Sequence, residues 1–566
     1  MIETFDAMSR GQTLNLKKGL TFKIMLFLLG LFLLLRLPGI FLPYHQDEWK
    51  NVSAAATVER AGSFFAHPPL MQMMFVAAHK MFGADYFRIL PLLFALASAG
   101  FLYLVVWNRD GKKAALWSTT LYATSFYAVL GSLVPDVDGA ILPFFFLLTI
   151  YLYDRWADSK KLKWFLLLVS SLITGFLIKL SFVLVVGTLV VDYLIEHWRS
   201  VTFRKATLGI AVLAGFSFFY IALLYLIRFA YPAFDIGIMF GHANQFADNI
   251  GRNWIQVIVQ GMKAIFYLSP LFLVPFLFIN QEIFKKTRIF FVYLILGFIF
   301  YFVLFDFSRG ALDKYLMFAV IPLATIGGVI FGDIFNSSNK VISKKFLFIS
   351  LGVGAVISAI LWALNSMSHS VVPLYPKEEW FNRVLHFDWK VLNPFNGGSG
   401  PLGFYVSFLF IAASFIVSIT LSIIGIFKKE WRRGLVVILV MIGVTYNLVF
   451  VEELMFGKIN GNAPKVMREA ISFITDSEEI KNVLTYNDIG NHELSAIGKY
   501  AGRIYATPQS EAGYKKKFTE FDGQYLIVEI PRLSGFYREF FEDCQTLFET
   551  SSGKITGRVF DCPQNQ

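Results

Sequence analysis

The stretch LFLLGLFLLLRLPGIFLPYHQDEW, residues 26–49, decides how the chain begins to fold. Its apolar part belongs to a run near residues 20–42, which is long enough to cross a bilayer core of about 30 Å as a helix. Because no small-residue cleavage site precedes the acidic pair, we interpret this run as a retained span rather than a signal peptide. Asp47 and Glu48 follow at its outer end. Carboxylates beside a membrane are costly to desolvate, so the pair indicates a functional site.

Composition predicts a polytopic membrane protein. Apolar residues make up 56% of the 566 positions, charged residues only 16%, and the net charge is +11. The basic residues gather in short loops, which lie on the cytoplasmic side of membrane proteins. They are too scattered to form one nucleic-acid-binding surface. With the basic loops inside, the hydrophobic runs predict thirteen spans, near 20–42, 87–107, 114–132, 139–154, 163–180, 182–197, 206–229, 259–280, 289–305, 315–334, 346–366, 402–427 and 434–451.

The segment 163–197 could be read as a single long helix. Both of its flanks are basic, however, so an even number of crossings must lie between them. We therefore predict two short helices that meet on the outer side near residues 179–181. The odd total number of spans then places the N-terminus in the cytoplasm and the end of the chain outside.

The chain becomes polar after the last span. We predict a membrane domain over residues 1–451 and a small soluble extracytoplasmic α/β domain over residues 452–566. APKVMREAISFITDSEEI reads as an amphipathic helix from about Pro464, and NVLTYND and QYLIVEI read as strands. The two cysteines, Cys544 and Cys562, both lie here. They form either a disulfide, which the outer side permits, or two separate buried thiols.

The first outer loop, residues 43–86, contains two amphipathic segments. In DEWKNVSAAATVERAG and in PPLMQMMFVAAHKMFG, apolar and small residues recur at helical spacing. We expect two helices in the plane of the membrane interface, with their apolar faces toward acyl chains. Asp47 and Glu48 would then begin the first helix. This geometry suits an enzyme whose substrate has a lipid tail and a polar head.

A second acidic pair, Asp136 and Asp138, lies at the outer start of the predicted fourth span, in VPDVDGA. An aspartate at a helix N-terminus can simply cap the helix, because it offsets the positive end of the helix dipole. The two carboxylates nevertheless face the same side as Asp47. They are also the candidate oxygen ligands for a divalent metal, although two carboxylates on one loop are weak evidence for one.

A set of cationic and polar residues is predicted on the same outer side. Each alone reads as a snorkelling or capping residue. Together they provide the charges and donors that a phosphate at headgroup depth requires. The set comprises Lys50, His67 in the tetrad HPPL, Arg88 at the start of the second span, Lys179 at the end of the fifth, and Lys314 with Tyr315 at the start of the tenth.

The order of these motifs resembles the GT-C glycosyltransferases of the protein O-mannosyltransferase and lipid A aminoarabinose (4-amino-4-deoxy-L-arabinose) transferase group. The resemblance rests on an acidic pair after span one, HPPL, an Arg opening span two and an acidic residue opening span four. It covers about residues 41–315 by motif and the rest by topology. It departs from the aminoarabinose branch at His67, where that branch has Lys, and so leans toward the relatives that carry HPPL.

The resemblance implies a GT-C fold and transfer of a sugar from a polyprenyl-phosphate donor, usually with inversion. The acceptor is a lipid, a protein or a glycan on the extracytoplasmic face of the cell membrane. It implies that Asp47 acts on the acceptor hydroxyl, with Glu48 as its neighbour, and that Lys50 and His67 lie near the lipid phosphate. No cofactor is required, because the phosphate is a competent leaving group. A transporter or flippase of lipid-linked sugars is the alternative, but inverted repeats and broken midplane helices are not evident. The sequence identifies neither sugar nor acceptor, and it assigns no role to the loop 367–401.

Overall fold

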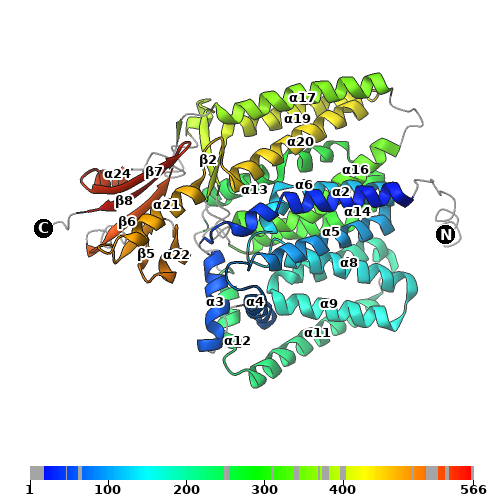
Figure 1. The fold of residues 1–566 in the computed structure, drawn as a ribbon. Coiled ribbons are helices and arrows are strands. Elements are labelled where there is room, and N and C mark those ends of the chain that lie inside the picture. Colours follow the sequence, from blue (N-terminus) through cyan, green and yellow to red (C-terminus); the bar gives the residue numbers. More distant parts are fainter. Residues whose placement is uncertain are drawn as a thin grey trace.

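The computed structural model describes residues 18–45, 47–61, 67–200, 202–247, 252, 254–306, 312–336, 343–367, 370–371, 382–395, 403–486, 488–504, 520–529 and 535–562. These residues form a large bundle of helices with a smaller domain of mixed strands and helices at one end (Figure 1). Most of the loop 367–401, including YPKEEW at 375–380, lies outside the described residues.

The bundle contains a helical segment at each of the thirteen predicted spans. Among the described residues, ten segments are long and apolar enough to cross a membrane. Two separate helices occupy 163–197 as predicted, and Lys179 between them has an extended backbone. The segments are α2 (Lys18–Leu34) with η1 (Leu37–Phe41), α5 (Ile89–Asp110), α6 (Lys112–Thr124) with α7 (Phe126–Gly131), α8 (Ile141–Ser159), α9 (Leu162–Ile178), η2 (Leu180–Phe182) with α10 (Val183–His197) and η3 (Trp198–Ser200), α11 (Phe203–Ala230), α13 (Trp254–Leu273) with η4 (Val274–Phe278), α14 (Gln281–Phe298) with η5 (Ile299–Leu304), α15 (Leu312–Tyr315) with η6 (Leu316–Ala319) and α16 (Val320–Asn336), α17 (Lys344–Ser366), α19 (Phe408–Phe427) and α20 (Arg432–Met455).

These apolar runs are expected to form helices, because a lipid core offers the backbone no hydrogen-bond partners. Large apolar side chains point outward from the bundle, among them Phe203 and Phe229 on α11, which are 86% and 88% exposed. Inside the bundle, small residues let helices approach closely. A Cβ atom on Gly328 of α16 would lie 2.1 Å from the Ser118 hydroxyl of α6, so only glycine fits there.

The first outer loop folds into two helices, α3 (Asp47–Ala61) and α4 (Pro69–Phe82). This confirms the two predicted helices and the place of Asp47 and Glu48 at the start of the first. The expected direction of their apolar faces was wrong. Met71 and Phe75 are buried against protein side chains, in a cluster with Phe87 from the neighbouring loop. The loop therefore packs on the bundle, and its position is set by protein contacts.

A small sheet of three strands joins the bundle to the tail domain. Its strands are β1 (Ser370–Val371), β2 (Val391–Phe395) and β3 (Phe404–Ser407). β3 occupies the start of the predicted span 402–427, so that span begins later than predicted, at Phe408. The physical reason is that β3 pairs antiparallel with β2, and the Ser407 hydroxyl then caps α19 by accepting from the Phe410 N–H.

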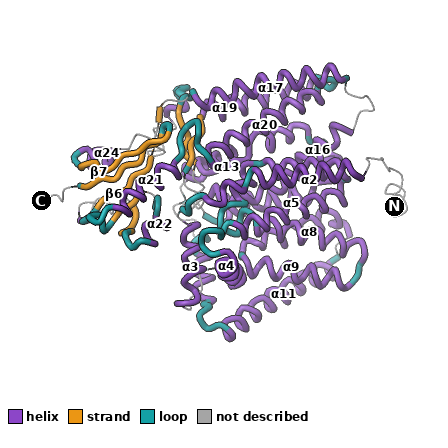
Figure 2. Tube along the Cα trace, viewed as in Figure 1, coloured by secondary structure: helices purple, strands orange, loops and turns teal. Residues whose placement is uncertain are grey.

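The tail domain is a five-stranded sheet with strand order β5-β4-β6-β8-β7 (Figure 2). β4 lies parallel to β5 and to β6, whereas β8 is antiparallel to β6 and to β7. α21 (Ala463–Asp476) buries Val466, Met467 and Ile474 against the sheet. The predicted helix and both predicted strands are confirmed. The remaining elements are β4 (Val483–Tyr486), α22 (Asn491–Ala496), β5 (Tyr500–Ile504), β6 (Gln524–Glu529), α24 (Gly535–Glu542), β7 (Gln545–Ser552) and β8 (Ile555–Asp561).

Cys544 and Cys562 form a disulfide, with their Cα atoms 4.4 Å apart. It joins the residue before β7 to the residue after β8, which are adjacent strands in the sheet. Of the two alternatives left open by the sequence, the structure therefore has the paired form.

Candidate active site

The polar residues singled out in the sequence come together at one end of the bundle. α3, α4 and the tail domain lie at this end, whereas α2 begins at the opposite end (Figure 1). Six separate segments supply the side chains: the start of α3, the residues before α4, the N-cap of α5, the loop between α7 and α8, the junction of α9 with η2, and α15. These segments are far apart in the sequence, so the site exists only in the folded bundle.

Arg88 and Glu48 form a closed pair in which both side chains are fully buried. Arg88 donates to both Glu48 carboxylate oxygens, and also to the main-chain oxygens of Leu42, Pro43 and Leu133. Glu48 in turn accepts from the His45 N–H at 3.1 Å, so it reaches back over the start of α3 as a capping residue does. The pair fixes where α3 begins and how it points.

This arrangement corrects one expectation. Arg88 was expected at the membrane interface, free to bind the donor phosphate without a part in the core. It is buried, with its donors directed at Glu48 and at main-chain oxygens. Breaking such a pair leaves a buried charge without its partner, which destabilises the fold. We therefore treat Arg88 and Glu48 as residues that position α3.

Asp47, the neighbour of Glu48, lies in an open setting. Its side chain is 38% exposed, and one carboxylate oxygen accepts from Lys50 Nζ at 2.7 Å. Lys314 Nζ lies 3.9 Å from the other oxygen and also pairs with Asp136, which comes from the α7–α8 loop. Carboxylates and ammonium groups thus alternate from Lys50 through Asp47 and Lys314 to Asp136. Of these carboxylates, Asp47 is the accessible one, because the Asp136 side chain is only 8% exposed.

A second ion pair, between Lys179 and Asp138, lies beside the first. The Tyr315 ring connects the two, because Lys179 Nζ is 4.7 Å and Lys314 Nζ 5.2 Å from its centroid. An aromatic face stabilises a nearby ammonium group. The structure therefore places a buried lysine, Lys314, and a partly buried one, Lys179, against one tyrosine, with an aspartate partner for each.

His67 lies within the electrostatic reach of this network. Burial, with a smaller contribution from nearby Lys179, lowers the pKa of His67 to about 3, although Asp136 opposes the shift. At neutral pH the imidazole is therefore uncharged, so one ring nitrogen donates a hydrogen bond and the other accepts one. In place of the cation found at this position in the aminoarabinose branch, this chain has a neutral ring.

His242 is a site residue that the sequence analysis missed. It lies on α12 (Ile236–Asn244), and its ring makes an edge-to-face contact with His67, with centroids 5.1 Å apart. α12 is fixed locally because the Asp235 carboxylate accepts from the N–H groups of Gly237 and Ile238. An Asp followed by an apolar stretch that ends in His, DIGIMFGH, was the available indication.

The charges of the Asp136–Lys314 pair are mutually stabilised. Burial alone would raise the pKa of Asp136, but Lys314 and Lys179 outweigh it and hold that pKa below its usual value. Burial likewise opposes the charge on Lys314, yet Asp136 and Tyr315 raise its pKa well above the usual value. Both groups are ionised at neutral pH, so Lys314 keeps its positive charge beside Asp47.

Asp136 and Asp138, the candidate metal ligands, each have a lysine partner. Within the described part of the chain, no group of three or more His, Cys, Asp and Glu side chains is arranged to hold a metal ion. The metal therefore remains a prediction of the sequence that these contacts do not support.

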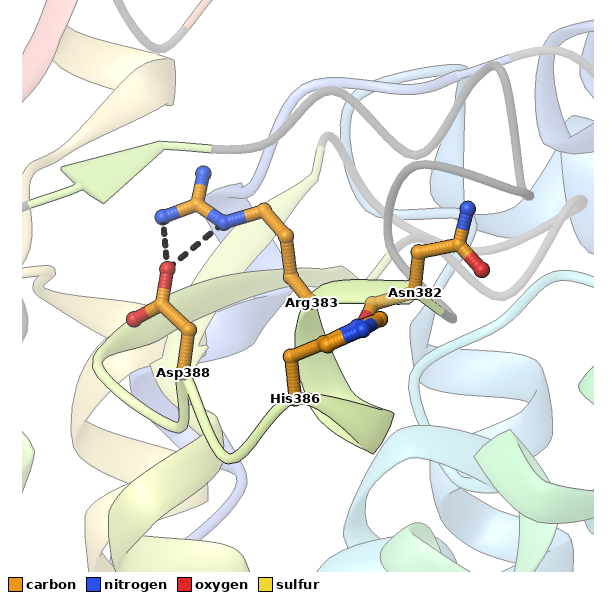
Figure 3. A pocket seen from close by; sticks show the side chains of 4 residues that line it. All are labelled: Asn382, Arg383, His386 and Asp388. Carbon is orange, nitrogen blue, oxygen red and sulfur yellow. Dashed lines mark hydrogen bonds and ion pairs between the residues drawn. The ribbon is translucent and has the colours of Figure 1, made fainter.

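A separate polar cavity of about 440 Å³ lies in the segment 382–388. Asn382, Arg383, His386 and Asp388 line it, and Arg383 pairs with Asp388 across its edge (Figure 3). Its lining residues come from the loop 367–401 alone, so it is not formed by the segments that carry Asp47.

Comparisons with known proteins bear on the fold and the family of this chain. Residues 66–225 match the family described as dolichyl-phosphate-mannose-protein mannosyltransferase. Over 96% of its length the chain superposes on 98% of ArnT from Cupriavidus metallidurans bound to undecaprenyl phosphate, with a TM-score of 0.53 and 12% sequence identity. The chain has the GT-C fold. The family match and this fold together indicate a membrane glycosyltransferase that resembles the ArnT group, as the sequence motifs implied.

Other comparisons are weaker. Apo ArnT from the same organism gives a TM-score of 0.49 at 13% identity, over 96% of this chain and 98% of that one. The Archaeoglobus fulgidus oligosaccharyltransferase in its apo form gives 0.40 at 10% identity, over 91% of this chain and 70% of that one. A comparison with curated protein sequences found no match. The family match includes His67, Arg88, Asp136, Asp138 and Lys179, whereas Asp47 precedes it.

Proposed function

We propose that this protein transfers a sugar from a polyprenyl-phosphate donor to a hydroxyl group of a lipid, protein or glycan acceptor. The reaction takes place at the extracytoplasmic face of the cell membrane, with Asp47 as general base. The observation that carries the proposal is the setting of Asp47. It is an accessible carboxylate that belongs to a lysine-rich network at the end of a membrane bundle. ArnT, the structure with the same fold, binds a polyprenyl phosphate.

The donor phosphate has a natural place in this network. When the sugar leaves, negative charge grows on the phosphate oxygens, and fixed cations stabilise that charge. Lys50 is the exposed lysine beside Asp47, and Lys314 and Lys179 lie behind it. His67, as a neutral ring, can donate one hydrogen bond, and the Tyr315 hydroxyl another. No metal is needed for this charge stabilisation.

The acceptor hydroxyl would lie on the Asp47 side of the donor sugar. Asp47 takes the hydroxyl proton while the acceptor oxygen bonds to the anomeric carbon, and the carbon–oxygen bond to the phosphate breaks. The electron pair of that bond leaves with the polyprenyl phosphate. Because attack and departure occur on opposite faces of the carbon, the product is inverted. Glu48 stays paired with Arg88 and holds Asp47 in place.

The test uses purified protein in nanodiscs with a synthetic polyprenyl-phosphate sugar. The proposal expects release of free polyprenyl phosphate in equal amount to the sugar transferred, measured by mass spectrometry of lipids and glycans. Chelation of divalent metals should leave the rate unchanged. If the protein moves the labelled donor across vesicle membranes and leaves its phosphate–sugar bond intact, the flippase alternative is correct.

The orientation can be tested separately by cysteine labelling. The described residues contain no free cysteine, so a single added cysteine would report its own position. Ser551→Cys in the tail domain should react with an impermeant maleimide in intact cells, and Lys286→Cys near the start of α14 should not. Equal labelling of the two would contradict the orientation and with it the extracytoplasmic site.

A further inference from the structure

The tail domain touches the bundle at the segment that contains Asp47. His492, in the first turn of α22, packs edge-to-face on Tyr44 with ring centroids 5.4 Å apart, and its ring lies tilted against Trp49 with centroids 4.5 Å apart. The Nδ1 atom of His492 is buried and has no hydrogen-bond partner among the described residues. His492 therefore contacts Tyr44 and Trp49 by packing of the rings and not by a hydrogen bond from Nδ1.

Asp488 makes the second contact of the tail domain with this segment. It lies near the buried side chain of His45, close enough for an electrostatic interaction between the two side chains. Asp488 has a positive φ of 62°, which is uncommon for a residue other than glycine. Its carboxylate holds this conformation, because it accepts from Arg503 at 2.6 Å and from the Tyr500 hydroxyl, both on β5. Such strained residues persist where the surrounding structure fixes them, and they cluster at functional sites.

The three residues that the tail domain contacts, Tyr44, His45 and Trp49, lie on both sides of Asp47 in the chain. On the opposite side, the same segment is held by Arg88, which pairs with Glu48 and lies 4.6 Å from the Tyr44 ring centroid. Residues 44–45 and 47–49 are thus held between the tail domain and the bundle. Neither half of the molecule alone determines where the Asp47 carboxylate lies.

We propose that His492 and Asp488 are positioning residues for the transfer reaction, acting through the segment 44–49 on Asp47. The tail domain then completes the active site without contacting the reacting atoms. This inference rests on the proposed function, because it gives Asp47 the role of base. Its physical basis is that a general base must lie within hydrogen-bond reach of the proton that it removes. A displacement of about 1 Å can lower a rate roughly 100-fold.

The first experiment measures the contact without any reaction. Hydrogen–deuterium exchange of residues 44–52 is compared in the full-length wild type and in His492→Ala. The inference expects faster exchange of these amides in the variant, since the first turn of α3 loses its support. Unchanged exchange would overturn it. This result does not depend on activity, so a wild type that transfers no sugar would refute the proposed function and still leave the positioning contact tested.

The second experiment measures the consequence for catalysis. His492→Ala should lower kcat roughly 10- to 100-fold with little change in the donor KM, and His492→Phe, which keeps an aromatic ring, should restore most of the loss. In an Asp47→Asn background, His492→Ala should have almost no further effect, because residues that act as one unit are not additive. Independent, additive losses would show a merely structural role and overturn the inference.

A matched control separates this contact from docking of the tail domain in general. Lys554 joins the tail domain to the bundle at another point, where its Nζ donates to the main-chain oxygen of Ser366, the last residue of α17, at 3.5 Å. Lys554→Met should leave exchange at residues 44–52 and kcat near the wild-type values. If Lys554→Met slows the reaction as much as His492→Ala, the specific role of His492 is refuted.

Discussion

Asp47 and Glu48 are adjacent in the chain but lie in opposite environments. Glu48 is fully buried and bound to Arg88, which also donates to main-chain oxygens of two other loops. Asp47 is 38% exposed, and the lysines around it leave its carboxylate within reach of a ligand. The buried Glu48–Arg88 pair fixes where α3 begins, whereas Asp47 and its lysine neighbours lie where a ligand can reach them. The two adjacent acidic residues therefore differ in what they can do: Glu48 holds the start of α3, and Asp47 can meet a ligand.

The strongest way to test this division is Asp47→Asn. The amide keeps the size and much of the hydrogen bonding but cannot accept the proton. General-base catalysis contributes typically ~100- to 10,000-fold, so kcat should fall by that factor while the variant still folds. The measurement is transfer rate together with thermal unfolding of the purified protein. Transfer near the wild-type rate would remove Asp47 from the base role.

Arg88→Met tests the buried Arg88–Glu48 pair. Removing one partner of a buried ion pair typically costs ~3–5 kcal/mol, because the other charge remains buried. We expect a lower free energy of unfolding and poor recovery of folded protein in detergent. The double variant Arg88→Met/Glu48→Met should recover part of that stability yet keep a low transfer rate, since α3 loses its cap. If Arg88→Met unfolds like the wild type and only weakens donor binding, Arg88 is a phosphate ligand after all.

Lys50→Met tests the exposed Lys50–Asp47 pair. Exposed ion pairs contribute about 0–1 kcal/mol to stability, so the unfolding transition should hardly move. A charge-assisted hydrogen bond to a phosphate is stronger, about 1.5–3 kcal/mol, and its loss should raise the donor KM roughly 10- to 100-fold. Lys465→Met on α21 is the control, since Lys465 has a similar exposed pair with Glu469. Equal donor KM values for both variants would exclude Lys50 from the phosphate site.

The smallest expected effect concerns pH and His67. Its pKa in the folded protein is lowered to about 3 from 6.5, mainly by burial, so the unfolded chain takes up the proton first as the pH falls. The stability that the neutral ring contributes is present above pH 6.5 and is lost progressively as the pH falls toward 3. His67→Gln should flatten this loss, seen as a smaller drop in the unfolding temperature between pH 7.5 and pH 5. An identical drop in both proteins would contradict the neutral, buried ring.

Much of the site was predictable, for identifiable reasons. The acidic pair at 47–48, the loop aspartates 136 and 138, and the lysines 50, 179 and 314 all stood out because charged residues are rare beside membrane spans. The structure brings these residues together as ion pairs. The position of Arg88 was misjudged, since a charge at a span end reads as interfacial in any sequence. His242 was missed because a lone His in an outer loop has no partner visible in the sequence.

The membrane class, the position of the helices, the polar tail domain and the list of charged residues near one face could all be predicted from the sequence. Those follow from local composition, because the bilayer selects long apolar helices and excludes charge. Which charges pair, which carboxylate stays accessible, and the contact of the tail domain with Tyr44 and Trp49 became clear from the folded structure. The physical reason is that burial and electrostatic pairing depend on distances between segments, such as the 3.9 Å between Lys314 and Asp47, which lie more than 260 residues apart in the chain.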